Sequence, residues 1–494
     1  MTDSLTAALS AYASGEIDWP ALKKTSAGFG IYRQKNGLFM MRLRRTGGYA
    51  SVEDLAVLSE LMRRWAVPKL HLTTRQDFQL HDIRPEQTGE ILAYCRAHAF
   101  PFLGGGGDTF RNVYLQPGAD LTPGSVFPVR PLATALAKAF CEVPKAYALP
   151  RKLKIAFADR PQDGGLLLAA SNDLGFLATV KDGRPVFQVW VGGGLGGRPR
   201  LGLKLFDDLP AEHCIRLAVA LTELFHAKGN RENRANARIR FLRDQLGGDE
   251  TFAAELKARY ASVQAPLAPV VPQLPAPVVQ TYTPANQWQQ LAVIPGPAPD
   301  RCSVRLFVPN GNLTEPQLTR IHQWLREIGT QEIQILPSQD LLLCNLSVED
   351  LPAIQAALLN DFADIDLTVR SFAGHIVTCV GNTVCMAGAG DPTPTAQTLA
   401  AGLDRLLPEG SPEKARYAKT ILTDLRISGC PNSCAAHQTA RFGYFCRLKD
   451  GQRGVAPYTP ATATPLALGT LQVGAFIPDE ALAQHILDQL APRP

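Results

Sequence analysis

Several features that would assign the protein to a class at once are missing from this sequence. It has no uninterrupted run of about 18 apolar residues, which excludes a membrane-spanning helix. Its first twenty residues contain no basic stretch followed by an apolar stretch, which excludes a secretory signal. We therefore expect a protein of the cytoplasm that does not enter a membrane.

No charge of one sign dominates either. The chain has 50 Lys and Arg against 45 Asp and Glu, a formal net charge of +5 over 494 residues. This gives no case for binding nucleic acid, although a mild excess of positive charge fits anionic substrates or an acidic electron-transfer partner. The 46% of hydrophobic and 19% of charged residues are typical of globular proteins, and the length predicts several structural units.

Cysteine is scarce, with ten in the chain, and we expect no disulfide framework in a cytosolic protein of this size. Six cysteines occur singly in mostly apolar or strand-like surroundings, which predicts buried structural thiols. These six are Cys95, Cys141, Cys214, Cys302, Cys344 and Cys446.

Proline is concentrated at 265–285, a stretch without helical or strand periodicity. This composition predicts an extended, semi-rigid linker, which we assign to 263–300 so that it includes a second proline-rich loop. The linker separates two related halves. Residues 39–83 align with 302–346 without a gap, and the pattern in each predicts a strand, a turn with glycine, a helix and a strand.

The aligned positions show where the two copies differ. Arg42, Gly48, Leu55 and the pair Gln76-Asp77 fall on Arg305, Gly311, Leu318 and the pair Gln339-Asp340. The first copy has polar residues where the second is mostly apolar, which indicates a functional first copy and a structural second one. The first copy carries Thr73, Thr74, Arg75 and Gln79 in place of Leu336, Pro337, Ser338 and Leu342. Two such copies predict a pseudo-twofold molecule, whose junction is a natural place for a large cofactor.

The remaining four cysteines form two close pairs in the second half. Cys379 and Cys385 have five residues between them, and Cys430 and Cys434 have three. Four clustered thiolates can ligate zinc or an iron–sulfur cluster. Zinc fingers and ribbons favour a two-residue spacing, so these spacings and the neighbouring glycine and proline favour a [4Fe–4S] cluster.

The segment SGCPNSCAAHQ at 428–438 resembles the cluster signature of the siroheme-dependent sulfite and nitrite reductases. The resemblance implies that all four cysteines hold a [4Fe–4S] cluster and that Cys434 also bridges to the iron of siroheme. It further implies that Asn432 belongs to the cofactor-binding residues. Reduction of sulfite to sulfide takes six electrons, and a cluster that shares a ligand with the haem can deliver them singly.

The first half matches the basic motifs of the same family in order. FMMRLR resembles the segment that points Arg42 at the substrate, GDTFRN gives Arg111, and LPRKLK gives Lys152 and Lys154. These four residues are the implied catalytic set, which neutralises the anion and supplies protons. The implied siroheme contacts are His71, Thr73, Arg75, Gln79, Arg151, Gly192, Gly193 and Gly194, together with Arg234. The glycines are expected where side chains would collide with the macrocycle.

The sequence departs from the family pattern at two places. His71 stands where the family often has arginine, so one siroheme contact is expected to be weaker or dependent on pH. Arg441-Phe442-Gly443 follows the last cysteine pair where the family often has Asp-Ile-Gly.

The resemblance implies an α+β fold with duplicated ferredoxin-like half-domains and two siroheme- and cluster-binding α/β domains. The expected division is 1–107 and 301–370 for the half-domains, and 108–262 and 371–494 for the binding domains. Electrons are expected from a separate ferredoxin or flavoprotein reductase.

Sulfite is the expected substrate and nitrite the alternative. Nitrite reductases of the family tend to have asparagine at the position of Lys154, and one more ammonium group favours the more highly charged anion. Two other hypotheses are the related monooxygenase of corrin synthesis and a non-catalytic iron–sulfur subunit. The full basic set speaks against both.

Overall fold

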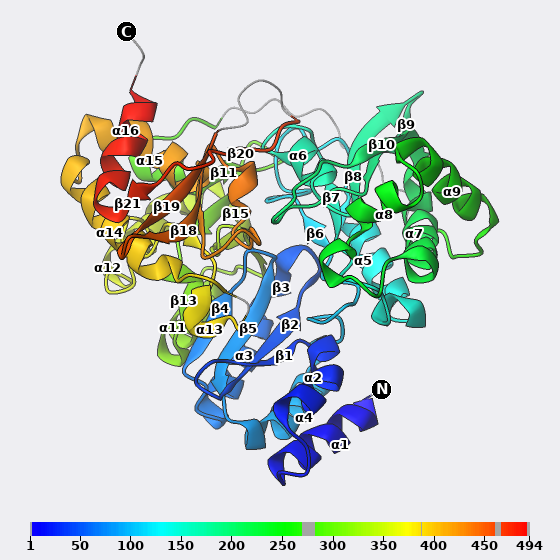
Figure 1. Cartoon of the computed structure of the whole chain (residues 1–494). Helices are drawn as coiled ribbons and strands as arrows, with labels where there is room; N and C mark the ends of the chain where they lie inside the picture. Colours follow the sequence, from blue (N-terminus) through cyan, green and yellow to red (C-terminus); the bar gives the residue numbers. More distant parts are fainter. Residues whose placement is uncertain (1, 269–281, 387, 460–465, 492–494) are drawn as a thin grey trace.

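The structure is a computed structural model that describes residues 2–268, 282–386, 388–459 and 466–491. The described strands form four sheets. Figure 1 shows the blue N-terminal strands at the bottom, the cyan and green segment to the right, and the yellow to red C-terminal segment to the left. None of the described helices has both the length and the apolar character needed to cross a membrane.

The two repeated segments build two sheets, and each sheet contains one strand from the other half of the chain. The strand orders are β1-β2-β5-β4-β13 and β11-β12-β15-β14-β3. β13 (Asn312–Leu313) pairs with β4 (Lys69–Leu72), and β3 (Tyr49–Ser51) pairs with β14 (Glu332–Ile335). The half-domains are therefore interlocked. The other strands are β1 (Ile31–Arg33), β2 (Phe39–Arg44), β5 (Asp77–Ile83), β11 (Val293–Pro295), β12 (Arg301–Leu306) and β15 (Leu341–Ser347).

The helices of the two copies begin in the same way. α3 (Val52–Arg64) and α11 (Glu315–Glu327) each start with a capping box, in which the side chains of the N-cap and N3 residues bond to each other's backbone amides. The N-cap residues are Ser51 and Thr314. This local signal fixes where both helices start and confirms the predicted duplication.

Unusual backbone angles are shared by the two copies as well. Gln76 and Gln339 have φ angles of 60° and 68°, and Gly48 and Gly311 have φ angles of 79° and 63°. Positive φ is uncommon for residues other than glycine. The two turns therefore fold alike although most of their side chains differ.

The other two sheets also share one topology. β6 (Tyr114–Leu115), β7 (Ile155–Ala158) and β8 (Leu174–Lys181) are parallel neighbours, and β9 and β10 follow antiparallel. In the C-terminal segment β16, β17 and β18 are parallel, and β19 is antiparallel to β18. The duplication therefore includes the predicted binding domains. The bounds are β9 (Arg184–Val191), β10 (Leu203–Pro210), β16 (Val377–Thr378), β17 (Leu425–Ser428), β18 (Phe442–Lys449), β19 (Gln452–Thr459), β20 (Thr470–Leu471) and β21 (Ile477–Pro478).

Helices cover these sheets (Figure 1). The first half adds α1 (Thr2–Ala13), α2 (Trp19–Ser26), α4 (Thr88–Ala97), α5 (Arg130–Phe140), α6 (Gly165–Ala170), α7 (Cys214–Lys228), α8 (Ile239–Gln245) and α9 (Asp249–Ser262). The second half adds α10 (Gln287–Ala292), α12 (Leu351–Asn360), α13 (Gly381–Val384), α14 (Pro392–Leu406), α15 (Pro412–Asp424) and α16 (Leu482–Leu490).

Two large hydrophobic cores position the site. One core joins the two half-domains to the C-terminal segment, and the other fills the segment from Phe110 to Ala268. The second core also takes in Tyr49 and Cys344 from the half-domains. The motifs around Arg42 and Arg75 therefore share one core with the segment of the cysteine pairs, and the motifs around Arg111 and Lys152 belong to the other core.

The predicted linker at 263–300 is too long at its C-terminal end. α10 and β11 lie inside it, and β11 pairs with β12 as the edge strand of a half-domain. Asn286 caps α10 by accepting from the amide of Gln289, and Trp288 is buried. The proline-rich centre of the linker, residues 269–281, lies outside the described residues.

The prediction of buried structural thiols is confirmed for Cys95, Cys214, Cys302 and Cys344. It is wrong for Cys141, which is exposed at the C-cap of α5, beyond the last residue of the helix. Cys446 is half-buried on β18.

Candidate functional site

The predicted substrate residues meet where the first half-domain faces the segment that begins at residue 108. Arg42 lies on β2, and Arg111 follows the glycine-rich loop. Both guanidinium groups donate to the carbonyl oxygen of Gly105, from Nη1 of Arg42 at 2.7 Å and from Nη1 of Arg111 at 3.1 Å. One backbone carbonyl therefore holds the two arginines of the predicted catalytic set together.

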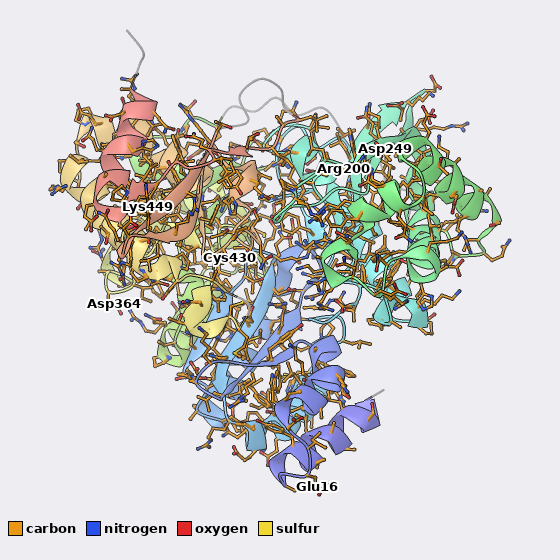
Figure 2. The ribbon with its side chains drawn as sticks, viewed as in Figure 1. Glu16, Arg200, Asp249, Asp364, Cys430 and Lys449 are labelled. Atoms are coloured by element: carbon orange, nitrogen blue, oxygen red, sulfur yellow. The ribbon has the colours of Figure 1, made fainter. Side chains whose placement is uncertain are left out.

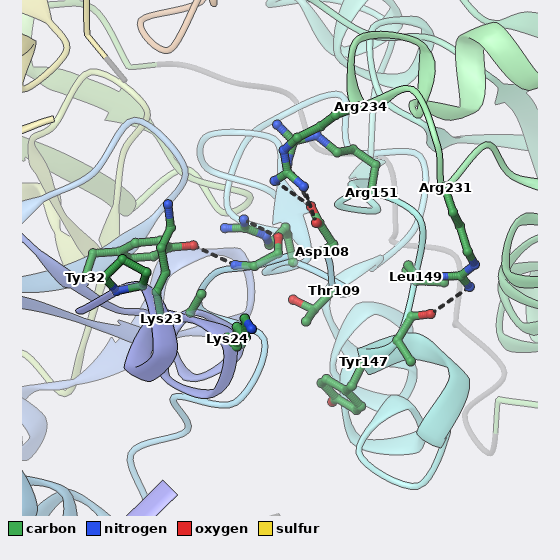
Figure 3. A pocket seen from close by; sticks show the side chains of 16 residues that line it. Lys23, Lys24, Tyr32, Asp108, Thr109, Tyr147, Leu149, Arg151, Arg231 and Arg234 are labelled. Carbon is green, nitrogen blue, oxygen red and sulfur yellow. Dashed lines mark hydrogen bonds and ion pairs between the residues drawn. The ribbon is translucent and has the colours of Figure 1, made fainter. Parts of the chain in front are cut away.

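A cavity of about 580 Å³ opens beside Arg111 (Figure 3). Its lining includes six basic side chains and a single acidic one, Asp108. Arg151 and Arg234 converge on Asp108, with Nη1 to carboxylate distances of 2.8 and 2.7 Å (Figure 3). The six basic residues are Lys23, Lys24, Arg111, Arg151, Arg231 and Arg234. This surplus of positive charge suits a polycarboxylate cofactor and a small anion.

The lysines of the predicted set lie before β7 and are half-buried among arginines. Burial lowers the pKa of Lys152 to about 7, with help from Arg238 and Arg111, and lowers the pKa of Lys154 well below its ordinary value. The Cys434 thiol acts on Lys152 in the opposite direction. The predicted bridging cysteine is therefore near this lysine.

The loop between β4 and β5 is held by its own threonines. The amides of Arg75 and Asp77 donate to Oγ1 of Thr73, at 3.3 and 2.9 Å. The hydroxyl of Thr74 donates to the carbonyl oxygen of Cys434 at 2.8 Å. This contact joins the loop predicted to grip siroheme to the last cysteine.

Arg75 donates to the carbonyl oxygen of Asn112 at 3.0 Å, and its Nε is buried without a hydrogen-bond partner in the part of the chain that the structure describes. Burial lowers the pKa of Arg75 to about 10. The Nε of Arg111 is unpartnered in the same way. Such donors fit carboxylate groups of a bound cofactor, because leaving a buried donor unpaired costs about 1–3 kcal/mol.

Gln79 lies opposite Arg42 in the sheet. Its Oε1 accepts from Nη2 of Arg42 at 3.1 Å, and its Nε2 contacts Nε2 of His81 at 3.2 Å. Gln79 therefore orients Arg42 in this structure. Its predicted contact with siroheme stays a prediction.

His71 lies between the two halves of the chain. Nε2 of Gln339 donates to Nε2 of His71 at 3.1 Å, so Nδ1 of His71 carries the proton and donates to Oδ1 of Asn312 at 2.8 Å. Burial lowers the pKa of His71 to about 4, and the ring is neutral. Both ring nitrogens are engaged by the second half-domain, and contact of His71 with siroheme stays a prediction.

The glycines at 192–194 follow β9 and are needed by the protein itself. A Cβ on Gly193 would lie 2.2 Å from the carbonyl oxygen of Ala170. A Cβ on Gly192 would meet the side chain of Arg243, and one on Gly194 would meet that of Arg240. That a side chain at 192–194 would collide with the macrocycle stays a prediction. The structure does show that such a side chain would collide with other residues of this chain.

Substitution of Gly193 by alanine is expected to destabilise the protein by about 1–3 kcal/mol, because a backbone oxygen must move. Thermal unfolding would measure the loss. Gly197→Ala is the matched control, since a Cβ there has no neighbour within 4 Å among the described residues. Equal unfolding temperatures for the two variants would contradict the packing argument.

The four paired cysteines lie on loops of the C-terminal segment, and Figure 2 places Cys430 near the centre of the molecule. Cys379 follows β16, Cys385 caps α13, and Cys430 and Cys434 follow β17. The thiols of Cys430 and Cys434 both act on the pKa of Cys379, which burial raises to about 11. The amide of Gly429 donates to Sγ of Cys379 at 3.2 Å.

This arrangement fits a cluster. Three thiols are close enough to influence one another, and a backbone amide already points at one sulfur, as in iron–sulfur sites. Within the described ranges, no three His, Cys, Asp or Glu side chains surround a point where one metal ion would bind. A [4Fe–4S] cluster does not require such a point, because each of its four irons takes a separate thiolate.

Two further contacts close the cysteine loop against its surroundings. Gln438 and Gly196 exchange hydrogen bonds, with the Gly196 amide donating to Oε1 at 2.9 Å and Nε2 donating to the Gly196 oxygen at 2.8 Å. Ser428 accepts from the amide of Ala435 at 3.2 Å and contacts Nδ1 of His437 at 2.8 Å. The glycine-rich loop of one half is thereby fixed to the cysteine loop of the other, with the exposed Asn432 at its tip.

Sequence reasoning missed part of the site. Lys23 and Lys24 on α2 reach the cavity although nothing in their sequence surroundings signals it. Arg238 and Arg240 lie in the stretch 231–240, which alone would be taken for a solvent-facing helix, yet both are buried. Arg238 donates to both carboxylate oxygens of Asp173 at 3.0 Å.

Arg441-Phe442-Gly443, where the sequence departs from the family pattern, does not line the cavity. Arg441 donates to the carbonyl oxygen of Gln489 on α16, and Phe442 is buried as the first residue of β18. A Cβ on Gly443 would lie 1.9 Å from the carbonyl oxygen of His437. Arg441 thus contacts the C-terminal helix, and Phe442 and Gly443 pack inside the C-terminal segment.

Comparison with known families gives two matches. The family described as "Nitrite and sulphite reductase 4Fe-4S domain" matches residues 106–262. The family described as "Nitrite/Sulfite reductase ferredoxin-like half domain" matches residues 32–98 and 294–361. The second match coincides with the interlocked half-domains.

Individual proteins agree with these matches. The chain is 29% identical over 429 residues to the ferredoxin–nitrite reductase of Synechococcus elongatus, covering 84% of this chain and 78% of that one. It is 24% identical over 443 residues to the sulfite reductase [NADPH] hemoprotein beta-component of Staphylococcus epidermidis, covering 82% and 73%. The solved structure of the Mycobacterium tuberculosis NirA protein has the same fold, with a TM-score of 0.77, 22% identity, and coverage of 97% and 90%.

Proposed function

Because the chain belongs to the nitrite and sulfite reductase family of oxidoreductases, whose cofactors are siroheme and a [4Fe–4S] cluster, we propose that it reduces sulfite to sulfide. The observation that carries the choice of sulfite is the second lysine, Lys154, which lies close enough to Lys152, Arg75 and Arg238 for their charges to act on it. When bound, the two cofactors supply the six electrons of the reaction singly.

The four basic residues have different roles toward the bound anion. Arg42 and Arg111 stay charged and fix the orientation of the oxyanion, since a guanidinium donates through a planar fork of N–H groups. Lys152 has a pKa of about 7 and can give a proton to a departing oxygen and regain it near neutral pH. Each oxygen leaves as water after receiving two protons, so donors on several sides of the anion are required.

Lys154 favours a doubly charged anion. Its pKa is lowered by burial and by Arg75, Lys152 and Arg238. A bound dianion offsets more of this repulsion than a monoanion does and allows both lysines to be charged together. Nitrite is the second candidate, because the Synechococcus elongatus relative at 29% identity is named a nitrite reductase.

Steady-state reduction of sulfite and nitrite by the holoenzyme, with reduced methyl viologen as donor, tests this choice. We expect kcat/KM to be several-fold higher for sulfite, and Lys154→Asn to reverse the preference, because the pocket then loses one positive charge. A clear preference of the unaltered enzyme for nitrite would instead support the second candidate. The visible spectrum would check that the variant retains siroheme.

We also propose that a separate protein delivers the electrons. The names of the relatives point to two classes of donor, ferredoxin in one case and NADPH in the other. Turnover with each donor system in place of methyl viologen would distinguish them.

A further inference from the structure

Asp77 begins β5 and is 3% exposed. The charges of Arg42, Arg44, Arg75 and Arg111 all act on its carboxyl group. The one ion pair it forms within the described residues is weak, with Nε of Arg42 lying 3.8 Å from Oδ2. Its Oδ1 is buried and accepts no hydrogen bond from any described residue. A carboxylate thus lies among four cations without a strong bond to any of them.

The arginines direct their N–H groups elsewhere. Arg42 donates to Gln79 and Gly105, and Arg111 donates to the carbonyl oxygens of Gly105 and Gly107. Burial therefore outweighs the nearby positive charges and raises the pKa of Asp77 to about 6.

The second copy of the repeat shows what the same position does without a pocket. Asp340 accepts at Oδ2 from Nε of Arg305 at 2.8 Å and lies 2.6 Å from its Nη2. Its Oδ1 accepts from the amide of Val308 at 2.9 Å. Asp340 is equally buried, at 4% exposed, but both of its oxygens are satisfied. It has the ordinary form of a structural ion pair.

One difference between the copies explains why Asp77 lacks the strong ion pair that Asp340 forms. Arg42 lies opposite Gln79 in its sheet, whereas Arg305 lies opposite Leu342. The amide oxygen of Gln79 competes for the guanidinium of Arg42 and draws it away from Asp77, whereas leucine offers no acceptor. The first copy therefore lacks the strong arginine–aspartate ion pair of the second copy. The charge of Arg42 is left available for a bound anion.

We propose that Asp77 is a positioning residue that acts through Arg42, and that it takes up a proton from solvent when an oxyanion binds in the pocket. In the empty pocket the carboxylate offsets part of the charge of the arginines. A bound anion and an ionised Asp77 would be like charges on either side of Arg42, so binding favours the protonated carboxyl. Protonated Asp77 leaves the charge of Arg42 to the anion. This inference rests on the proposed binding of small oxyanions.

Nitrite binding to the oxidised holoenzyme tests the proposal, with the visible spectrum as readout. Nitrite is the probe because it stays a monoanion from pH 5 to 7, whereas sulfite titrates. For the unaltered enzyme we expect Kd to rise about tenfold from pH 5 to pH 7, since one proton is taken up above about pH 6. For Asp77→Asn we expect tight binding throughout and a clearly smaller rise of Kd over this range, the part that the two lysines with lowered pKa, Lys152 and Lys154, contribute.

Asp340→Asn is the matched control, because it changes the equivalent residue outside the pocket. It should lower the temperature of thermal unfolding and leave the pH dependence of nitrite binding as in the unaltered enzyme. Gln79→Leu copies the second repeat and should return Arg42 to Asp77. We therefore expect it to weaken nitrite binding at pH 7 and to move the pH dependence to lower pH.

The outcomes separate this inference from the proposed function. Nitrite binding by the unaltered enzyme with an unchanged pH dependence in Asp77→Asn would overturn the role of Asp77 alone. Failure of the unaltered holoenzyme to bind either nitrite or sulfite would contradict the proposed function and the inference together.

Discussion

Replacement of Cys434 by serine is expected to lower turnover by at least about a thousandfold, because residues that act as one unit lose nearly all activity when one is removed. The Cys434 carbonyl oxygen accepts from Thr74, and its thiol acts on the pKa of Lys152. It is therefore the cysteine placed to serve the cluster and the substrate side together. A serine hydroxyl keeps the shape of the side chain but is a poor ligand for iron–sulfur iron.

Iron and acid-labile sulfide per chain, together with the visible spectrum of siroheme, would be measured beside activity. Cys446→Ser is the matched control, because Cys446 is close enough to Cys379 for that thiol to act on its pKa, yet it lies outside the two pairs. The control should keep its iron and its activity. Turnover of Cys434→Ser at the level of the control would show that Cys434 is not a cluster ligand.

Replacement of Lys152 by methionine is expected to lower kcat/KM for the oxyanion by about 10²–10³-fold, the usual effect of removing one preorganised donor from an anion site. Methionine fills a similar volume without the charge. The effect should appear with sulfite and with nitrite, because Lys152 serves both as a cation and as a proton donor.

The pKa of Lys152 also predicts in which direction the rate changes with pH. Burial and neighbouring arginines lower the pKa of Lys152 to about 7, so the ammonium form is complete below that pH and is lost above it. The kcat of the unaltered enzyme, measured at saturating substrate so that the pH dependence of binding through Asp77 does not enter, should therefore fall as the pH rises through about 7. Lys152→Arg should retain part of the activity and lose this decline, since arginine stays charged.

Lys145→Met is the control for a general effect of charge, since Lys145 is exposed and pairs with Glu223 at 3.0 Å outside the cavity. It should leave kcat/KM unchanged. A Lys152→Met enzyme with full activity, or with the same decline near pH 7, would exclude Lys152 as the proton donor.

Much of the fold could be predicted because its signals are local or repeated. The shift that superimposes Arg42 on Arg305 identified the two copies, and the structure gives both the same turns and the same capping boxes. The end of the linker was misjudged because α10 and β11 are short, and their burial depends on the neighbouring sheet. Cys141 was misjudged because apolar neighbours along the chain do not say which face of α5 is covered.

The sequence by itself determined the chemistry of this protein. Two cysteine pairs of distinct spacing and an ordered set of basic motifs are properties of residue type and local spacing, and neither depends on how the halves pack. Through the family that these motifs resemble, they were sufficient to identify the cofactors and to predict the anion pocket.

Tertiary structure decided which distant residues meet. The exchange of β3 and β13, the contact of His71 with Asn312, and the bond from Thr74 to Cys434 join parts of the chain that local patterns cannot relate. The state of Asp77 was decided in the same way. Its charge depends on where Gln79 and four arginines lie around it, because the free energy of a buried carboxylate is set by its surroundings in space and not by its neighbours in sequence.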